Sequence, residues 1–292
     1  MANSKSDFYR PIFEDESERL QVSRGCSYNK CRFCTMYKGV EFEVTPREEI
    51  VRQIDSIANS AHVHRIFLSG GNAMAIPQDE MMFTLEQIRE KIPSCKKVGC
   101  FARIDSVMAK SDQELMELAA LGLDDIAIGA ESGSEDALEF MHKGHTTADI
   151  LEQCGRLDEA GLVYSLYYLA GIAGHGKCIE NAHATAELFG KTNANRILFH
   201  TMTLFSGSKL EEDVEAGRFV MADEREVLEE IRTFVEELPI RALLMAQHFG
   251  NLAQFTGYVP DDREKIVAYI DGILENRSEE SMRAYRKCIK TM

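Results

Sequence analysis

Residues 24–34 read RGCSYNKCRFC and place three cysteines in the spacing C-x4-C-x2-C. The three are Cys26, Cys31 and Cys34, and Gly25 in front of them lets the backbone turn sharply. A structural zinc site or an electron-transfer iron–sulfur cluster takes four protein ligands. Three thiolates that hold a 4Fe-4S cluster leave one iron open, and an open metal position usually binds a substrate or a cofactor. The stretch therefore indicates a metal site with a free position.

Two other interpretations of the cysteines stay open at this point. The trio is compatible with half of a zinc site in a structural or adaptor protein, completed by a distant Cys or His. It is also compatible with buried thiols that never meet a metal. No second C-x-x-C is present, and the other cysteines are scattered singly at Cys95, Cys100, Cys154, Cys178 and Cys288. The trio alone does not choose between these possibilities.

The composition limits which classes of protein this chain can belong to. The chain has 292 residues, of which 45% are hydrophobic, and this is enough for one large domain. No apolar run is long enough to span a bilayer, and the polar N-terminus lacks a signal-peptide core, so we expect a cytoplasmic protein with reduced cysteines. The formal charge of −15 disfavours nucleic acid and anionic membranes as partners.

Helix and strand signals alternate along the first two thirds of the chain. We expect helices over residues 46–59 (with Thr45 as cap), 79–92, 111–122, 147–160 and 179–191, and strands over 65–68, 97–102, 125–129, 162–169 and 196–204. Several strands are almost continuously apolar, which is typical of a parallel sheet covered on both faces. Repeated strand–helix units predict an α/β fold, an open or closed barrel whose site lies at the carboxyl ends of the strands.

Beyond Phe205 the pattern becomes helical, over residues 224–238, 262–275 and 279–290. We therefore expect a core barrel over residues 1–210 and a helical segment over 211–292 that closes it. Between these helices lies the polar stretch 247–251, QHFGN, which we interpret as a lid. A lid needs donors and acceptors to fix a small ligand.

Three strand ends complete a pattern with the cysteine loop. They read SGGN at residues 69–72, GAESGS at 129–134 and LAGIAG at 169–174. Together they resemble the radical S-adenosylmethionine superfamily over residues 22–210. The likeness is greatest to the core shared by tRNA methylthiotransferases, elongator-type acetyltransferases and oxygen-independent coproporphyrinogen oxidases. The stretches 128–133 and 141–146 (MHKGHT) are very similar to that core.

The resemblance implies a partial (β/α)6 TIM-like barrel in which Cys26, Cys31 and Cys34 bind three irons and S-adenosylmethionine chelates the fourth. It also implies cofactor contacts, namely Phe33 near the adenine; Ser69, Gly70, Gly71 and Asn72 at the methionine amino group; Glu131 and Ser132 at the ribose or carboxylate side; and Gly171, Ile172 and Gly174 against the adenine. Arg103 is a candidate for the methionine carboxylate, because a guanidinium binds carboxylates in a bidentate way.

Two features depart from the superfamily. Its usual spacing is C-x3-C-x2-C, so this chain has one extra residue in the first gap. We interpret this as a longer loop around the same cluster. Asn72 stands where many members carry Glu, and it can still accept a hydrogen bond from an ammonium but brings no charge.

The resemblance implies an enzyme that takes an electron from flavodoxin or ferredoxin and cleaves S-adenosylmethionine reductively to a 5′-deoxyadenosyl radical. No general base stands out in the sequence, so the catalytic residues stay unassigned. We expect a buried small-molecule substrate near His248 and Asn251 of the lid or near His200 and Tyr167 on the strands. Our leading expectation is a lyase acting on queuine in 7-deazaguanine salvage, and the alternative is an oxygen-independent tetrapyrrole-modifying enzyme.

Overall fold

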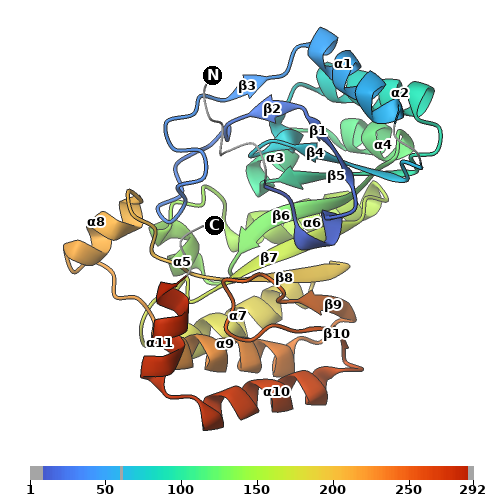
Figure 1. Cartoon of the computed structure of the whole chain (residues 1–292). Helices are drawn as coiled ribbons and strands as arrows, with labels where there is room; N and C mark the ends of the chain where they lie inside the picture. The colour runs from blue at the N-terminus through green and yellow to red at the C-terminus, as the bar shows by residue number, and fades with distance from the viewer. Residues whose placement is uncertain (1–8, 60–61, 289–292) are drawn as a thin grey trace. The chain divides into compact units, whose positions relative to one another are not determined.

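The computed structural model describes residues 9–59 and 62–288 of the chain (Figure 1). Its main sheet has eight strands in the order β1-β4-β5-β6-β7-β8-β9-β10. These strands are β1 (Glu18–Gln21), β4 (Arg65–Ser69), β5 (Lys97–Ala102), β6 (Leu123–Glu131), β7 (Tyr164–Ala170), β8 (Arg196–Thr201), β9 (Ala242–Met245) and β10 (Thr256–Val259). The register is parallel for β1–β4, β4–β5, β5–β6 and β8–β9, and antiparallel for β9–β10. The α/β class with a mostly parallel sheet is thus confirmed.

Helices alternate with these strands as expected. They are α1 (Arg47–Ala58), α2 (Gln78–Lys91), α3 (Ile104–Met108), α4 (Asp112–Ala120), α5 (Glu135–Phe140), α6 (Thr147–Glu159), α7 (Cys178–Phe189), α8 (Lys209–Glu215), α9 (Glu224–Glu237), α10 (Arg263–Asn276) and α11 (Glu279–Lys287). Short strands β2 (Ser23–Arg24) and β3 (Glu43–Val44) pair in a separate antiparallel sheet. None of the described helices is long and apolar enough to cross a membrane.

Two expectations about local structure were wrong. The cap of α1 is Pro46, which has extended backbone angles, and not Thr45. The C-terminal part is also not purely helical, because β9 and β10 lie within it and the stretch 247–251 connects these two strands. Four-residue apolar runs such as ALLM carry no clear period, so periodicity alone does not identify them as strands. Residues 289–290 of the last expected helix lie outside the described part.

Contacts divide the chain into two units, and each is described here by itself. The first contains residues 1–29, 36–129 and 155–165, and the second contains residues 30–35, 130–154 and 166–292. Strands β6 and β7 contribute residues to both units. The expected division at residue 210 stays a prediction.

A buried ion pair anchors the first unit at the amino ends of its strands. Glu14 is completely buried and accepts a hydrogen bond from Arg65 Nε at 2.7 Å. The Ser17 hydroxyl also donates to this carboxylate. Arg65 is the first residue of β4, and the Asp125 carboxylate lies 3.7 Å from its guanidinium. This network occupies the amino end of β4, so the opposite end is left for the loop that follows Ser69.

The second unit has an aromatic core around Tyr168 on β7 and Phe234 on α9, whose ring centroids are 4.7 Å apart. Phe199 on β8 and Phe189 on α7 complete the cluster at 5.5 Å and 6.1 Å from Phe234. Figure 1 shows α7, α9 and α10 lying side by side, in agreement with their contacts. Large aromatic side chains of this kind bury most of the apolar surface of a core.

Glu230 on α9 is a carboxylate inside this core, with no exposed surface. It accepts hydrogen bonds from the Tyr168 hydroxyl at 2.8 Å, the Gly171 backbone N–H at 2.8 Å and Asn181 Nδ2 at 2.6 Å. Among the described residues no basic side chain forms an ion pair with it. Burial raises the pKa of Glu230 to about 7. The carboxylate therefore ties the end of β7 to α7 and α9 by accepting from neutral donors.

Replacing Glu230 with Gln should change how stability depends on pH. The pKa of Glu230 is about 7 in the folded protein, above the value of 4.5 for an unperturbed Glu, so its contribution to stability is greatest below about pH 4.5. That contribution is lost as the pH rises through about 7. At pH 5 the protonated carboxyl presents one O–H, whereas the amide of Glu230→Gln presents two N–H groups to the same donors and should cost about 1–3 kcal/mol.

The difference in unfolding free energy between wild type and Glu230→Gln should shrink from pH 5 to pH 8. Urea unfolding followed by circular dichroism measures it. Glu229→Gln, one residue earlier on the same helix, serves as the control. Equal pH dependence of the two differences would show that Glu230 does not titrate as proposed.

Candidate functional site

In the first unit, the cysteine loop lies against the end of β4. The Gly71 N–H donates to the Gly25 carbonyl at 2.9 Å. A Cβ on Gly71 would stand 2.6 Å from that same oxygen, so only glycine permits this approach. Gly70 has φ +143°, and a Cβ there would collide with Ser23. Cys26 follows Gly25 directly, so the structure brings the first cysteine beside the predicted glycine-rich strand end.

Ser69 and Asn72 are buried inside this arrangement. The Ser69 carbonyl accepts a hydrogen bond from Val22 N–H at 3.1 Å. Asn72 Nδ2 donates to Ser27 Oγ at 2.9 Å, and Asn72 Oδ1 accepts from Ser106 Oγ at 3.0 Å. The Arg103 N–H also donates to Oδ1, at 3.2 Å. Asn72 thus connects the cysteine loop with the segments that follow β4 and β5. Its expected contact with the methionine amino group stays a prediction.

Arg103 is held in a defined orientation. Its Nε donates to Asp105 Oδ1 at 2.9 Å, and its guanidinium carbon lies 3.9 Å from the centre of the Tyr28 ring. Cation–π stacking of this kind fixes the plane of a guanidinium. Asp105 and Tyr28 were not among the predicted site residues, although both lie within two residues of one that was.

A cavity of about 390 Å³ opens beside these residues. It is lined by Ser27, Asn72, Met74, Ala75, Ile76, Pro77, Gln78, Asp105, Ser106, Ala109, Lys110 and Glu114. Its walls come from the cysteine loop and the segments after β4 and β5. The carboxyl ends of parallel strands therefore border a space in this unit, as expected for α/β folds.

In the second unit, the segment 30–35 carries Cys31, Phe33 and Cys34. Its backbone is clamped at Arg32, whose N–H donates to Met141 O at 3.0 Å and whose carbonyl accepts from Leu210 N–H at 2.8 Å. The Cys34 N–H donates to Cys31 O at 3.3 Å, which makes a tight turn between the two thiols.

The donor set suits an iron–sulfur cluster. Cys26, Cys31 and Cys34 are all free of disulfides and partly exposed, whereas four of the other cysteines are buried. Thiolates are the ligands that iron–sulfur clusters take. Cys26, Cys31 and Cys34 therefore stay the predicted cluster ligands.

Glu131, at the end of β6, has the left-handed backbone angle φ 74°. This conformation is uncommon for residues other than glycine. Its carboxylate accepts from Lys143 Nζ at 3.0 Å, and the Lys143 side chain is only 3% exposed. Lys143 Nζ also lies 5.7 Å from the centre of the Phe33 ring. Sequence reasoning missed Lys143 as a site residue, although the stretch MHKGHT that contains it was part of the resemblance.

The loops after β6 and β7 are linked through side chains from two helices. The Ser132 hydroxyl donates to Asn181 Oδ1, and Asn181 Nδ2 donates to Glu230, which also accepts from the Gly171 N–H. Asn181 and Glu230 lie 49 and 59 residues from their strand-end partners, so no local pattern could have revealed them.

A second cavity, of about 630 Å³, lies within this unit. It is lined by Arg32, Ser134, Asp136, Ala137, Glu139, Phe140, His142, Ile172, Ala173, Gly174, His175, Lys177, Glu180, Asn181, Arg218, Phe219 and Val220. The predicted residues Ile172 and Gly174 are among them. Gly171 and Gly174 have φ +84° and +82°, and a Cβ on Gly174 would stand 2.8 Å from Val220 O. The glycines thus allow the loop to turn beside this space.

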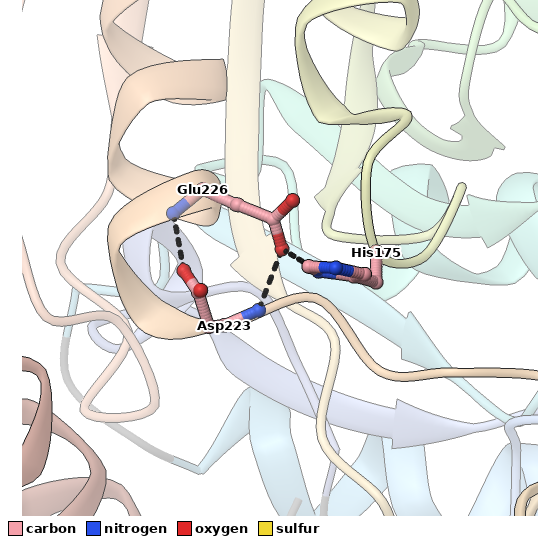
Figure 2. Close-up of side chains that lie close together, drawn as sticks. All are labelled: His175, Asp223 and Glu226. Atoms are coloured by element: carbon pink, nitrogen blue, oxygen red, sulfur yellow. Dashed lines mark hydrogen bonds and ion pairs between the residues drawn. The ribbon is translucent and has the colours of Figure 1, made fainter.

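His175, Asp223 and Glu226 also gather within 4.8 Å of one another, a spacing that metal ligands share (Figure 2). Their potential ligand atoms already form hydrogen bonds with one another and with the backbone. Asp223 Oδ1 accepts from Glu226 N–H at 2.8 Å, and Glu226 Oε2 accepts from Asp223 N–H at 2.9 Å, which is the capping box of α9. His175 Nδ1 bonds to Glu226 Oε2 at 2.8 Å. We assign no metal here.

The four predicted substrate residues divide into two groups. Tyr167, His200 and His248 lie in contact, with ring centroids 5.0 Å apart for Tyr167 and His200 and 4.3 Å for His200 and His248. Asn251 is fully buried and donates to Phe199 O at 2.8 Å and Ala246 O at 3.0 Å. Asn251 therefore holds the connection between β9 and β10 in place, and the three rings form the candidate surface.

Comparison with solved structures identifies the same fold in several enzymes. Methylornithine synthase (PylB) has a TM-score of 0.57 at 14% identity, over 94% of this chain and 82% of its own. The archaeal Elp3 of Methanocaldococcus infernus has a TM-score of 0.56 at 16% identity, over 88% and 63%. The radical S-adenosylmethionine methyltransferase TsrM of Kitasatospora setae has a TM-score of 0.57 at 16% identity, over 68% of this chain but only 37% of TsrM.

Sequence comparison gives two further matches. An uncharacterized protein of Methanocaldococcus jannaschii is 22% identical over 94% of this chain and 87% of its own length. The family model described as Radical SAM superfamily matches residues 20–188, which span the cysteine loop and the strand ends described above. The chain therefore belongs to the radical S-adenosylmethionine superfamily, whose members bind a 4Fe-4S cluster and S-adenosylmethionine.

Proposed function

We propose that this chain binds its cluster through Cys26, Cys31 and Cys34, binds S-adenosylmethionine at the open iron, and abstracts hydrogen from a small molecule. The observation that carries the proposal is the Gly71–Gly25 hydrogen bond, which places the cysteine loop against the strand end expected to receive the methionine moiety. When bound, the cluster and S-adenosylmethionine supply a 5′-deoxyadenosyl radical. A flavodoxin or ferredoxin of the cytoplasm is the electron donor in this proposal.

The residues of the chain bind and orient the cofactor. Arg103, stacked on Tyr28, presents a guanidinium to the methionine carboxylate. Glu131 is held by Lys143 and accepts from a ribose hydroxyl. Phe33, whose ring lies beside the Lys143 ammonium, packs against the adenine. The loop around Ile172 packs against the adenine as well. Because these groups are already positioned, little conformational entropy is lost on binding.

The substrate in this proposal contacts His200, His248 and Tyr167. Of the two expected substrates, the 7-deazaguanine base of queuine fits this surface better than a tetrapyrrole. Burial lowers the pKa of His200 to about 3, so the ring stays uncharged at neutral pH. Tetrapyrrole side chains carry several carboxylates, which uncharged rings cannot neutralise. We therefore favour a lyase acting on a deazapurine.

Replacing Cys26, Cys31 or Cys34 singly with Ala should abolish cluster assembly, because each removes one of three ligands. After anaerobic reconstitution, the broad absorbance near ~400 nm, the bound iron and the formation of 5′-deoxyadenosine should all disappear. Cys95→Ala and Cys288→Ala are the controls and should retain all three signals. A Cys31→Ala protein with full iron content would refute the ligand assignment.

Glu131→Ala should weaken S-adenosylmethionine binding by about 1–3 kcal/mol, because a partly buried acceptor is lost. Lys143→Met should weaken it as well, since it leaves the Glu131 carboxylate without its cation. Equilibrium dialysis against the cluster-loaded protein measures both effects.

Lys191→Met is the matched control, because its ion pair with Glu187 is exposed on the surface. The double variant Glu131→Ala/Lys143→Met should lose less than the sum of the single losses, since the pair acts together. An unchanged dissociation constant in Glu131→Ala, with the cluster intact, would remove Glu131 from the site.

A further inference from the structure

The hydrogen bonds of His248 decide where its proton lies. The Gly250 N–H donates to His248 Nδ1 at 3.1 Å, so this nitrogen is an acceptor. A neutral imidazole with an acceptor at Nδ1 carries its proton on Nε2. Within residues 9–59 and 62–288, no group accepts from that Nε2–H. His248 therefore presents one unused donor.

His200 presents two unused nitrogens. Neither of them has a hydrogen-bond partner in the part of the chain that the structure describes. A neutral imidazole has one donor and one acceptor, so His200 and His248 together offer two donors and one acceptor. Their ring planes are inclined by 32°, and Tyr167 meets His200 at 68°, edge to face. Both side chains are partly exposed, so a ligand can reach these nitrogens.

Both imidazoles are uncharged near neutral pH. Burial lowers the pKa of His200 to about 3, and the neighbouring His248 adds to the effect. Burial also lowers the pKa of His248, with a further contribution from the positive charge of Arg286 on α11. The charged groups nearby already form hydrogen bonds or ion pairs with other residues. Arg286 donates to the Gly250 and Met202 carbonyls, and its Nε lies 3.4 Å from a carboxylate oxygen of Glu224 on α9.

We propose that His200 and His248 form a subsite for an uncharged, planar lactam or cyclic amide of the substrate. The carbonyl oxygen of a lactam can accept from the His248 Nε2–H while its adjacent N–H donates to the acceptor nitrogen of His200, and the other His200 nitrogen is left to donate to a second acceptor of the ligand. A carboxylate or phosphate would meet uncharged rings here and would lose its hydration without gaining an ion pair. This inference rests on the proposed function and names the substrate class of that same site.

The experiment uses two ligands of the same ring system. The probes are 7-deazaguanine, a neutral lactam, and its 7-carboxylate, which adds one negative charge. Both are titrated by calorimetry under anaerobic conditions into the cluster-loaded protein with S-adenosylmethionine bound. We expect 7-deazaguanine to bind at least about tenfold more tightly than the carboxylate, which corresponds to about 1.4 kcal/mol.

Variants show whether the imidazoles cause this preference. His200→Phe and His248→Phe keep a planar ring without nitrogens and should each weaken 7-deazaguanine binding about tenfold or more. His248→Gln keeps an N–H donor near the position of Nε2 and should retain most of the affinity. His183→Phe, an exposed histidine paired with Glu237 on the surface, is the control and should bind like wild type. Circular dichroism confirms that each variant is folded.

Different results contradict the inference and the proposed function. Equal affinity for the two probes, tighter binding of the carboxylate, no binding of either probe at millimolar concentration, or unchanged binding in both folded Phe variants would overturn the subsite. Failure of the wild-type protein to hold a cluster or to cleave S-adenosylmethionine would instead overturn the proposed function.

Discussion

Parallel strands end in backbone groups that neighbouring strands no longer satisfy, and the loops after them must find other partners. Each unit meets this constraint with a buried polar side chain. In the first unit Asn72 joins the segments around Ser27 and Arg103. In the second unit Glu230 accepts from the Gly171 N–H and, through Asn181, reaches Ser132. These side chains connect the strand ends that carry the candidate cofactor contacts.

Strand ends that are held by buried hydrogen bonds suit a chemistry in which the protein mainly binds and orients. A cofactor that generates a radical needs few acid–base groups from the protein and needs a fixed position relative to its substrate. The close approach of Gly71 to Gly25 is possible because neither residue carries a Cβ. The left-handed backbone of Glu131 costs free energy, and the surrounding contacts sustain it. Strained backbone of this kind is found mainly at functional sites, where the surrounding structure prevents the backbone from relaxing.

The charge of the site differs from that of the whole chain. The formal net charge is −15, yet the charged candidates occur as ion pairs, such as Arg103 with Asp105 and Lys143 with Glu131. The rings of His200 and His248 carry no charge at neutral pH. An acidic surface repels anions at long range, and a site of paired or uncharged groups gives them no compensating attraction. The net charge of the chain therefore does not describe the charge around the candidate residues.

The sequence by itself determined the α/β class, most helices and strands, the three cysteines and the family, because these features are local. Spacing between cysteines, a capping box at Ser111 or an apolar run such as residues 97–102 can be recognised within a dozen residues. Only the tertiary structure decided that β9 and β10 extend the sheet, that Lys143 pairs with Glu131, and that Asn251 supports a turn while His248 faces His200. These facts depend on contacts between residues far apart in the chain. Burial, which sets the pKa of Glu230 and of His200, is likewise a property of the packed fold and leaves no mark on neighbouring residues in the sequence.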